Sequence, residues 1–384
     1  MIGKKKFGKR TSGNPDIDNF IQQMQFKARH KGVIEWIPFD KFTNIKYLAK
    51  GGFGTVFKAK WTTDSWDSKN GQWERRNVCL KNLNCSKESI KIEFLNEIEN
   101  QLIHGGDSAI AIYGITKNLE DSNNMMVMQY AEQGSLRKLL DSKYKDLSWP
   151  HKIASLFFIA RGLSAIHEAN LMHKDFHSGN IVNENVYSSF ITDFGLCRPV
   201  SQDSSSAEIF GVLPYIAPEV LYTKEYSQKS DIYSFGIIMS EVFTGYPPYH
   251  DIPHNENLAI QVCLGHRPKI RCEAPQLLLD LMNKCLDAKP QNRPTAKELE
   301  NMLIQYIDGV GNHETELYKQ VKEIKDSGKN PSIYDQAKLT RFNYQTHKQA
   351  IYISRSLNFQ KLPEPVNAAI SQPIADLGDD WDVS

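Results

Sequence analysis

The sequence HKDFHSGN at residues 173–180 is followed by DFG at residues 193–195. Phosphoryl transfer requires an acceptor hydroxyl aimed in line at the phosphate and magnesium ions that hold the phosphates, and little covalent help from the protein. Asp175 is placed to accept the proton of a hydroxyl group. Asn180 and Asp193 offer the hard oxygen ligands that Mg²⁺ prefers. These two stretches therefore predict a site for phosphoryl transfer.

A glycine-rich turn lies upstream of this site. Residues 45–48 and 56–59 alternate like strands, and Gly51, Gly52 and Gly54 lie between them, with Val56 opening the second strand. Glycines lack a Cβ atom, so backbone N–H groups of such a turn can close over phosphates. A dinucleotide-binding fold would need a helix after the glycines, which this pattern does not provide. A plain hairpin turn remains the alternative.

A lysine that would need a partner when buried comes shortly before a segment with helical spacing. Lys81 ends the apolar run 78–81, and burying its ammonium group without a partner would be costly. Residues 89–103 carry apolar side chains at helical spacing and include Glu97. The alternative is that Lys81 is an exposed lysine at a sheet edge.

The order and spacing of these motifs resemble those of eukaryotic-type protein kinases, whose catalytic loop, DFG turn and A-P-E segment they match. Segments such as residues 134–136, 230–236 and 247–249 look most like the tyrosine-kinase-like branch of the Ser/Thr kinases. The resemblance implies an α+β bilobal fold over residues 33–306. We expect a β-rich N-lobe with one regulatory helix at about 42–130 and a mainly helical C-lobe at about 131–306.

The resemblance also assigns roles to single residues. Lys81, paired with Glu97, would hold the α- and β-phosphates of ATP, Asn180 and Asp193 would bind Mg²⁺, and Asp175 would orient the acceptor hydroxyl beside His177. The residues expected to bind ATP are Gly51, Gly52, Gly54, Val56, Cys79, Lys81, Met128, Gln129, Ala131 and Val182. The activation loop would carry the candidate phosphorylation sites Ser201, Ser204, Ser205 and Ser206, and the structural residues would be Glu219, paired with Arg293, and Asp231, bonded to the catalytic loop.

Several positions depart from the kinase pattern. Ala49 replaces the first glycine of the turn, and Gln101 stands where an apolar residue usually contacts the DFG phenylalanine. Lys174 replaces the arginine that pairs with a phosphorylated activation loop, and a lysine binds phosphate as a point charge rather than bidentately. In Ser/Thr kinases a threonine at the position of Val212 bonds a lysine at the position of His177. Both partners have changed here, so we expect the two positions to be coupled.

The composition is that of an ordinary globular protein. The chain has 384 residues, 40% of them hydrophobic and 24% charged, and a formal net charge of +1. This charge gives no reason to expect nucleic acid as a partner. Six scattered cysteines without a C-x-x-C pair favour reduced thiols and a cytoplasmic or nuclear location. No apolar run approaches the roughly 18 residues that a membrane span needs.

The two ends of the chain fall outside the resemblance. Residues 1–32 are polar and basic and are expected to form a flexible arm, or else to present residues 4–10 as a nuclear-targeting patch. Residues 307–384 are expected to form a partly disordered tail with a possible helix at 314–326. The tail could dock on the kinase domain or bind a partner, but an unstructured extension is the favoured expectation.

We therefore expect an ATP- and Mg²⁺-dependent protein kinase that phosphorylates Ser or Thr hydroxyls of protein substrates in intracellular signalling and is itself a target of an upstream kinase. An inactive pseudokinase scaffold and a dual-specificity or tyrosine kinase are the alternatives. A small-molecule phosphotransferase would share the catalytic loop but would lack the platform of Glu219 and Arg293 for a peptide substrate.

Overall fold

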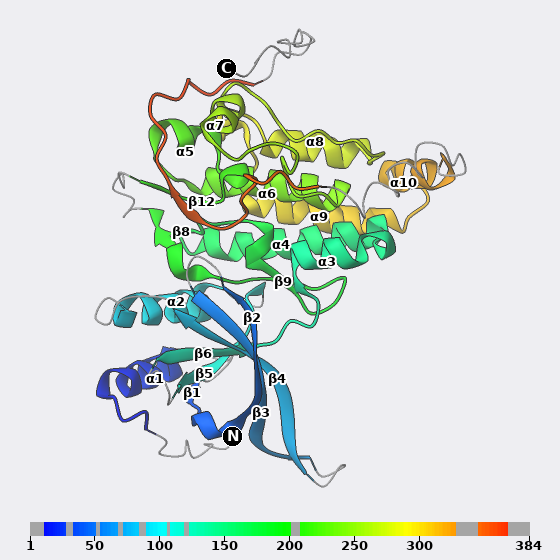
Figure 1. Ribbon diagram of the computed structural model, residues 1–384. Coiled ribbons are helices and arrows are strands. Elements are labelled where there is room, and N and C mark those ends of the chain that lie inside the picture. Colours follow the sequence, from blue (N-terminus) through cyan, green and yellow to red (C-terminus); the bar gives the residue numbers. More distant parts are fainter. Residues whose placement is uncertain are drawn as a thin grey trace.

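A six-stranded sheet and a set of packed helices form two lobes joined near residue 130 (Figure 1). The computed structural model describes residues 11–27, 34–50, 54–67, 72–83, 90–105, 108–118, 123–200, 208–327 and 345–367. Within these ranges, the sheet and two helices lie on one side of this junction, and the other helices lie on the other side. The expected bilobal α+β fold is confirmed.

The N-lobe sheet has the strand order β1-β5-β6-β4-β3-β2, antiparallel except for the parallel β1–β5 pair. The polar composition of residues 62–76 suggests a loop, but β3 and β4 continue to the pair Asp67 and Gln72. Their outer halves are polar because they extend beyond the core. The strands are β1 Glu35–Trp36, β2 Phe42–Lys50, β3 Gly54–Asp67, β4 Gln72–Leu83, β5 Ile112–Lys117 and β6 Asn124–Gln129.

Two helices pack in the N-lobe. The expected helix at 89–103 is α2 (Ile90–His104), and a further helix, α1 (Pro15–Lys27), lies beside it (Figure 1). α1 buries Ile17, Phe20, Ile21 and Met24 in one cluster with Phe94 and Ile98 of α2. The expectation of a flexible arm is therefore wrong for residues 15–27. The cause is a short amphipathic stripe, at i, i+3, i+4 and i+7, within a polar segment.

The C-lobe is built around α6 (Gln228–Thr244), whose residues from Ser230 to Thr244 are all buried. A helix that is buried on every side serves as the core of a helical domain. The other helices are α3 Leu136–Lys143, α4 Trp149–Glu168, α5 Pro218–Thr223, α7 Glu256–Cys263, α8 Gln276–Cys285, α9 Ala296–Val310 and α10 Glu316–Ser327. The short strands are β7 Gly134–Ser135, β8 Leu171–Met172, β9 Ile181–Asn183, β10 Ser189–Ile191, β11 Arg198–Pro199, β12 Ile209–Gly211 and β13 Arg355–Leu357.

Local capping explains where several of these helices begin and end. Thr295 and Glu298 form a reciprocal capping box at the start of α9, with the Thr295 hydroxyl accepting from the Glu298 N–H group at 3.2 Å. Ser227 and Ser230 form a similar box at the start of α6. α6 ends at Gly245, whose φ of 77° lies in the left-handed region that glycine adopts at little cost.

The tail differs from its expected disorder over residues 345–367. This segment follows the C-lobe surface beside β12 and α5 and then passes α7 (Figure 1). Leu357 and Leu362 are buried in the main C-lobe core, and the Val366 N–H group donates to the Cys263 carbonyl at 2.9 Å. Of the alternatives for the tail, docking on the kinase domain is the one observed for these residues.

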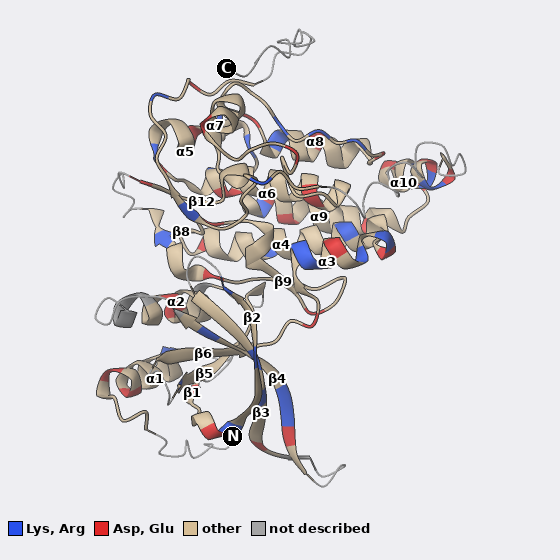
Figure 2. Cartoon of the chain, in the orientation of Figure 1, with Lys and Arg blue, Asp and Glu red and all other residues tan. Residues whose placement is uncertain are grey.

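Charged side chains of both signs are interspersed over the two lobes (Figure 2). This distribution agrees with the near-zero net charge of the sequence. Within the described ranges, none of the helices combines the length and the apolar composition that crossing a bilayer would require.

The buried ion pair between Arg293 and Glu219 gives a first test of the fold. Its two hydrogen bonds measure 2.7 and 2.6 Å, and the Arg293 side chain is fully buried. Arg293→Met leaves a largely buried carboxylate without its cation, so we expect the free energy of unfolding to fall by about 3–5 kcal/mol in urea titrations. Lys297→Ala removes an ion pair between a solvent-exposed lysine and Glu300, and it should leave the midpoint of the urea titration unchanged. Equal midpoints for both variants would contradict the assignment.

Candidate active site

Asp231 of α6 fixes the catalytic loop, residues 173–180, through hydrogen bonds to its backbone. Its carboxylate accepts the N–H groups of His173 at 2.9 Å and Lys174 at 3.1 Å, and it also bonds His167 Nε2 at 2.9 Å. Lys174 has a φ of 67°, a left-handed conformation that costs a side-chain-bearing residue on the order of 1 kcal/mol. The two hydrogen bonds to Asp231 compensate for this strain and fix the backbone that leads into Asp175.

Asp175 and Asn180 are held together at the centre of this loop. The Asn180 amide nitrogen donates to the Asp175 carbonyl at 2.9 Å and to its Oδ2 atom at 3.2 Å. Asp175 is 4% exposed, and its Oδ1 atom is buried without a hydrogen-bond partner among the described residues. The Asp175 carboxylate thus keeps accepting capacity in a buried setting, which suits it to receive the proton of a hydroxyl group.

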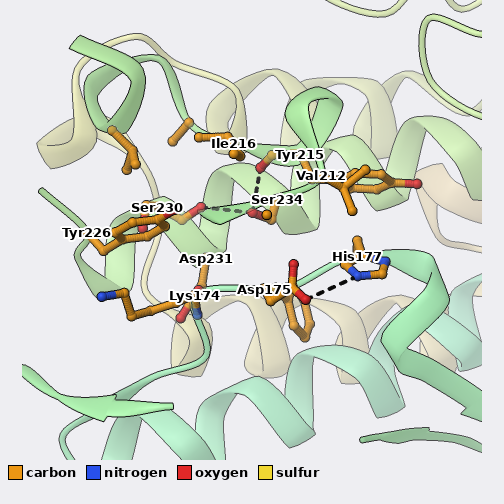
Figure 3. Close-up of a pocket in the computed structure, with 14 residues that line it drawn as sticks. Lys174, Asp175, His177, Val212, Tyr215, Ile216, Tyr226, Ser230, Asp231 and Ser234 are labelled. Atoms are coloured by element: carbon orange, nitrogen blue, oxygen red, sulfur yellow. Dashed lines mark hydrogen bonds and ion pairs between the residues drawn. The ribbon is translucent and has the colours of Figure 1, made fainter. Parts of the chain in front are cut away.

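His177 lies beside Asp175 in the catalytic loop, and a dashed line in Figure 3 marks the contact between them. Its Nε2 atom is 3.5 Å from Asp175 Oδ2. Burial opposes the charge of both groups, but their mutual attraction outweighs it. The pKa of His177 consequently lies above its ordinary value, and the pKa of Asp175 lies below its own. The attraction between the two side chains therefore favours the protonated form of His177 and the ionised form of Asp175.

Lys81 connects the two lobes of the site. Its ammonium nitrogen lies 2.6 Å from Glu97 Oε1 and 3.2 Å from Asp193 Oδ1. Burial opposes the positive charge, but the two carboxylates outweigh it and raise the pKa of Lys81 above its ordinary value. The alternative of an exposed edge lysine is excluded because Lys81 is 6% exposed. The structure thus brings together three of the residues to which the sequence assigned phosphate and metal binding.

The conformation around Asp193 depends on the catalytic loop as well. Asp193 has a φ of 65°, and the rings of Phe176 and Phe194 lie 5.4 and 5.7 Å from that of His173. His173 Nε2 also bonds the Thr192 carbonyl at 3.2 Å. The buried His173 ring therefore packs the DFG turn against the loop that carries Asp175.

Candidate adenine-binding residues gather in one apolar cluster. Met128 and Ala131 are buried in it, and Cys79 and Val182 pack against it. Cys79 is paired with Met128 across β4 and β6. Burial raises the pKa of the Cys79 thiol to about 11, so it remains a neutral, small apolar side chain. The Gln129 N–H group donates to the Ala111 carbonyl, so a bond from Gln129 to adenine could use only its carbonyl.

The glycine-rich turn is described in part. Gly54 and Val56 lie in β3, where they pair with Leu83 and Lys81 of β4. Val56 is therefore next to the lysine expected to hold phosphate. Gly51 and Gly52 lie outside the described residues. The same is true of the candidate phosphorylation sites Ser201, Ser204, Ser205 and Ser206.

Gln101 and Lys174, two departures from the kinase sequence pattern, each have a specific partner in the structure. The Gln101 amide nitrogen donates to the Ile110 carbonyl at 2.7 Å, so this buried polar side chain ties α2 to the loop before β5. The Lys174 ammonium group lies 4.5 Å from the centre of the Tyr226 ring, a cation–π contact. A phosphate on the activation loop would have to compete with this ring for the lysine.

The sequence analysis missed Glu241, which joins three elements below the site. This fully buried carboxylate accepts from Arg137 at 2.5 Å, Ser178 at 3.0 Å and Tyr215 at 2.7 Å. It thereby links α3, the catalytic loop and the segment after β12 to α6. One signal was present: a single acidic residue within the apolar run 235–243 requires buried partners.

The sequence analysis also missed a contact between Ser354 of the tail and Asp175. The Ser354 hydroxyl donates to Asp175 Oδ2 at 2.6 Å, and its oxygen lies 3.3 Å from His177 Nε2. Nothing in the local sequence around Ser354 predicts this contact, because the two bonded residues are 179 positions apart.

The donors around Asp193 fit a magnesium ion that arrives with a nucleotide. Mg²⁺ commonly takes one or two protein carboxylates and completes its shell with phosphate oxygens and water. Asp193 supplies a carboxylate and Asn180 an amide oxygen. In the described part of the chain, no group of three or more His, Cys, Asp or Glu side chains could hold a metal by itself. The donor set suits a metal shared with phosphates.

Residues 42–303 match the family model described as protein tyrosine and serine/threonine kinase. The chain belongs to this family, which confirms the resemblance inferred from its motifs.

Curated relatives agree with this membership. The chain is 28% identical over 268 residues to a probable serine/threonine-protein kinase of Dictyostelium discoideum, covering 67% of this chain and 19% of that protein. It is 32% identical over 273 residues to MDIS1-interacting receptor like kinase 2 of Arabidopsis thaliana, covering 65% and 25%. It is 26% identical over 305 residues to stress-activated protein kinase alpha of Dictyostelium discoideum, covering 76% and 45%. The chain spans less than half of the length of each of these proteins.

The shared pocket of His177 and Val212 predicts that the two positions are coupled. Both line one cavity with Asp175, and Figure 3 labels the three among the residues around it. We expect His177→Lys and Val212→Thr to change kcat/KM for a peptide substrate non-additively, with a coupling energy of about 0.5 kcal/mol or more. His177→Lys combined with the remote Lys297→Ala is the control and should be additive. Additivity in both pairs would contradict the coupling.

The ion pair of His177 and Asp175 predicts a pH-dependent stability. The pKa of His177 is raised above 6.5, so its contribution is complete below pH 6.5 and is lost as the pH rises through the raised value. The pKa of Asp175 is lowered below 3.8, so acid removes the contribution only below that pH. The difference in unfolding free energy between wild type and His177→Gln should therefore shrink as the pH is raised from 6.5 through the raised pKa of His177. A constant difference over this range would refute the pairing.

Proposed function

We propose that the chain is an active protein kinase that transfers the γ-phosphoryl group of ATP to Ser or Thr hydroxyls of proteins. The observation that carries this proposal is the position of Lys81, bonded to Glu97 of α2 and to Asp193 of the DFG turn at once. A lysine held between these carboxylates is fixed in the cleft where it can meet phosphate oxygens. The candidate base Asp175 lies in the loop that His173 packs against this same DFG turn.

The residues divide the work between positioning and proton transfer. Lys81 would bind the phosphates, and Glu97 would keep its ammonium group in place. Asp175 would accept the hydroxyl proton, with Asn180 holding its carboxylate by the 3.2 Å bond. Magnesium, bound by Asn180 and Asp193, would neutralise the charge of the phosphates. Fixed charges in a buried cleft require little reorganisation during the reaction, which is the main source of catalysis in such a site.

The pseudokinase alternative is disfavoured by the arrangement of the chemical groups. Ala49 and the changed pair His177 and Val212 are departures from the family pattern. They leave the lysine, both magnesium ligands and the base in contact with the partners that an active site needs. The small-molecule alternative is disfavoured by the Arg293–Glu219 pair, which braces the platform expected for a peptide substrate.

Specificity for serine and threonine is supported by the relatives, several of which are described as serine/threonine-protein kinases. Three further parts of the proposal go beyond membership in the kinase family. They are a role in intracellular signalling, a cytoplasmic or nuclear location, and an upstream kinase that phosphorylates one or more of Ser201, Ser204, Ser205 and Ser206.

Replacing the base tests the proposed activity. Asp175→Asn keeps the size of the side chain but removes its ability to take a proton. We expect the rate of phosphate transfer from Mg-ATP to a mixed Ser, Thr and Tyr peptide library to fall on the order of 10²-fold or more, measured by mass spectrometry of the products. Asp280→Asn, a matched change at an exposed site on α8, is the control and should retain the wild-type rate.

Two results would count against the proposal. Equal labelling by wild type and Asp175→Asn would exclude Asp175 as the base and leave the activity unexplained by this site. Phosphotyrosine as the main product would overturn the assignment to Ser and Thr.

A further inference from the structure

Residues 345–367 lie along the surface beside the candidate base and are held there at several points. The His347 N–H group donates to the His250 carbonyl at 2.8 Å, and the His254 N–H group donates to the Gln349 carbonyl at 2.9 Å. The Tyr352 hydroxyl donates to the Pro248 carbonyl at 2.8 Å. These contacts precede Ser354 and attach the segment to the loop between α6 and α7.

After Ser354 the segment becomes a strand. β13 pairs antiparallel with β12 of the activation segment, with Arg355 opposite Gly211 and Leu357 opposite Ile209. The Leu357 side chain is buried in the C-lobe core. The Ser354 residue is thus fixed from both sides, by side-chain and backbone bonds before it and by a paired strand after it.

The Ser354 side chain occupies the position of an acceptor hydroxyl. It donates to Asp175 Oδ2 at 2.6 Å, within the 2.6–3.2 Å reach that proton transfer to a general base requires. It lies 3.3 Å from His177 and is 8% exposed. The neighbouring Ser356, by contrast, points outward and bonds Glu208 at 3.0 Å. The placement therefore distinguishes one serine of the segment from the other.

We propose that Ser354 is a phosphorylation site of this chain's own active site, modified within the same molecule, and that residues 345–367 are its built-in substrate segment. The proposal rests on the kinase activity proposed above. It adds an identified acceptor residue and the direction in which a substrate backbone crosses the cleft, antiparallel to β12.

The reaction is a simple group transfer. The Ser354 oxygen forms a bond to the γ-phosphorus of ATP, while the bond from that phosphorus to the bridging oxygen of the β-phosphate breaks. The hydroxyl proton passes to Asp175 Oδ2 along the existing hydrogen bond. ADP leaves with the electron pair of the broken bond, and no oxidant or reductant is needed.

Phosphorylation changes the stability of the docked segment. A phosphoserine carries a charge of about −1.5 to −2 near neutral pH. On Ser354 this charge would lie next to the carboxylate of Asp175, to which the Ser354 hydroxyl is now hydrogen-bonded, and the two negative groups would repel each other. The neighbouring His177 side chain, 3.5 Å from Asp175, offsets only part of the repulsion. Unmodified Ser354 therefore blocks other hydroxyls from Asp175, and phosphorylated Ser354 is expected to leave the cleft and open it.

The first experiment follows the phosphorylation of the full-length, phosphatase-treated chain with Mg-ATP by site-resolved mass spectrometry. A reaction within one molecule is first order, so the rate constant for Ser354 should not change over a 100-fold range of enzyme concentration. Ser354→Thr should acquire phosphothreonine at the same position, because it keeps the acceptor hydroxyl. Ser356→Ala should retain the labelling of Ser354.

The second experiment measures an added Ser/Thr peptide in the same reactions. Wild-type enzyme should show a lag that ends as Ser354 becomes phosphorylated, and preincubation with Mg-ATP should abolish the lag. Ser354→Ala should remain at the slow initial rate, because its segment stays docked without acquiring a phosphate.

Each outcome decides for or against the proposal. An unlabelled Ser354 in an enzyme that phosphorylates the added peptide would overturn it and leave the proposed function intact. A rate constant for Ser354 that rises in proportion to enzyme concentration would show transfer between molecules and would also overturn it. Absence of transfer to any hydroxyl would refute both this proposal and the function on which it rests.

Discussion

Burying an ionised side chain without a partner costs several kcal/mol, and this constraint determines how the parts of the site meet. Lys81 requires carboxylates, so α2 and the DFG turn lie where Glu97 and Asp193 can reach it. Asp231 satisfies two N–H groups of the catalytic loop, which allows Lys174 to hold a strained backbone conformation beside Asp175. Each buried charge thus positions an element, and together they align the two lobes.

The sequence predicts these charges well because each lies in a short pattern whose spacing reflects local structure. Lys81 ends an apolar run, and Glu97 lies in a segment of helical spacing at the position that the kinase resemblance assigns to the partner glutamate. Contacts between distant segments carry no such local pattern. Glu241 needs partners from three elements, and Ser354 reaches Asp175 across 179 positions. The sequence shows that Glu241 is unusual, but only the fold shows which groups it binds.

The predictions of a flexible arm and a disordered tail were wrong where a polar segment carries a few apolar side chains that pack on the core. Residues 15–27 and 345–367 are too polar on average to suggest a packed structure. In each, a few side chains make the contact with the core, such as Phe20 in the first and Leu357 in the second. The outer parts of β3 and β4 show the converse: two strands can continue by pairing with each other, without apolar alternation. Average hydrophobicity therefore underestimates order at the margins of a domain.

The way in which the tail crosses the cleft bears on how other substrates are recognised. Pairing of β13 with β12 uses main-chain groups, which every peptide possesses, so it favours an extended backbone rather than a particular sequence. Selectivity must then come from side-chain contacts such as the burial of Leu357 three positions after Ser354. A tethered segment also has an effective concentration that can reach the millimolar range. A separate protein therefore competes for the cleft at a disadvantage while Ser354 is docked, and the same contacts that identify Ser354 as an acceptor make the tail a control on access to the site.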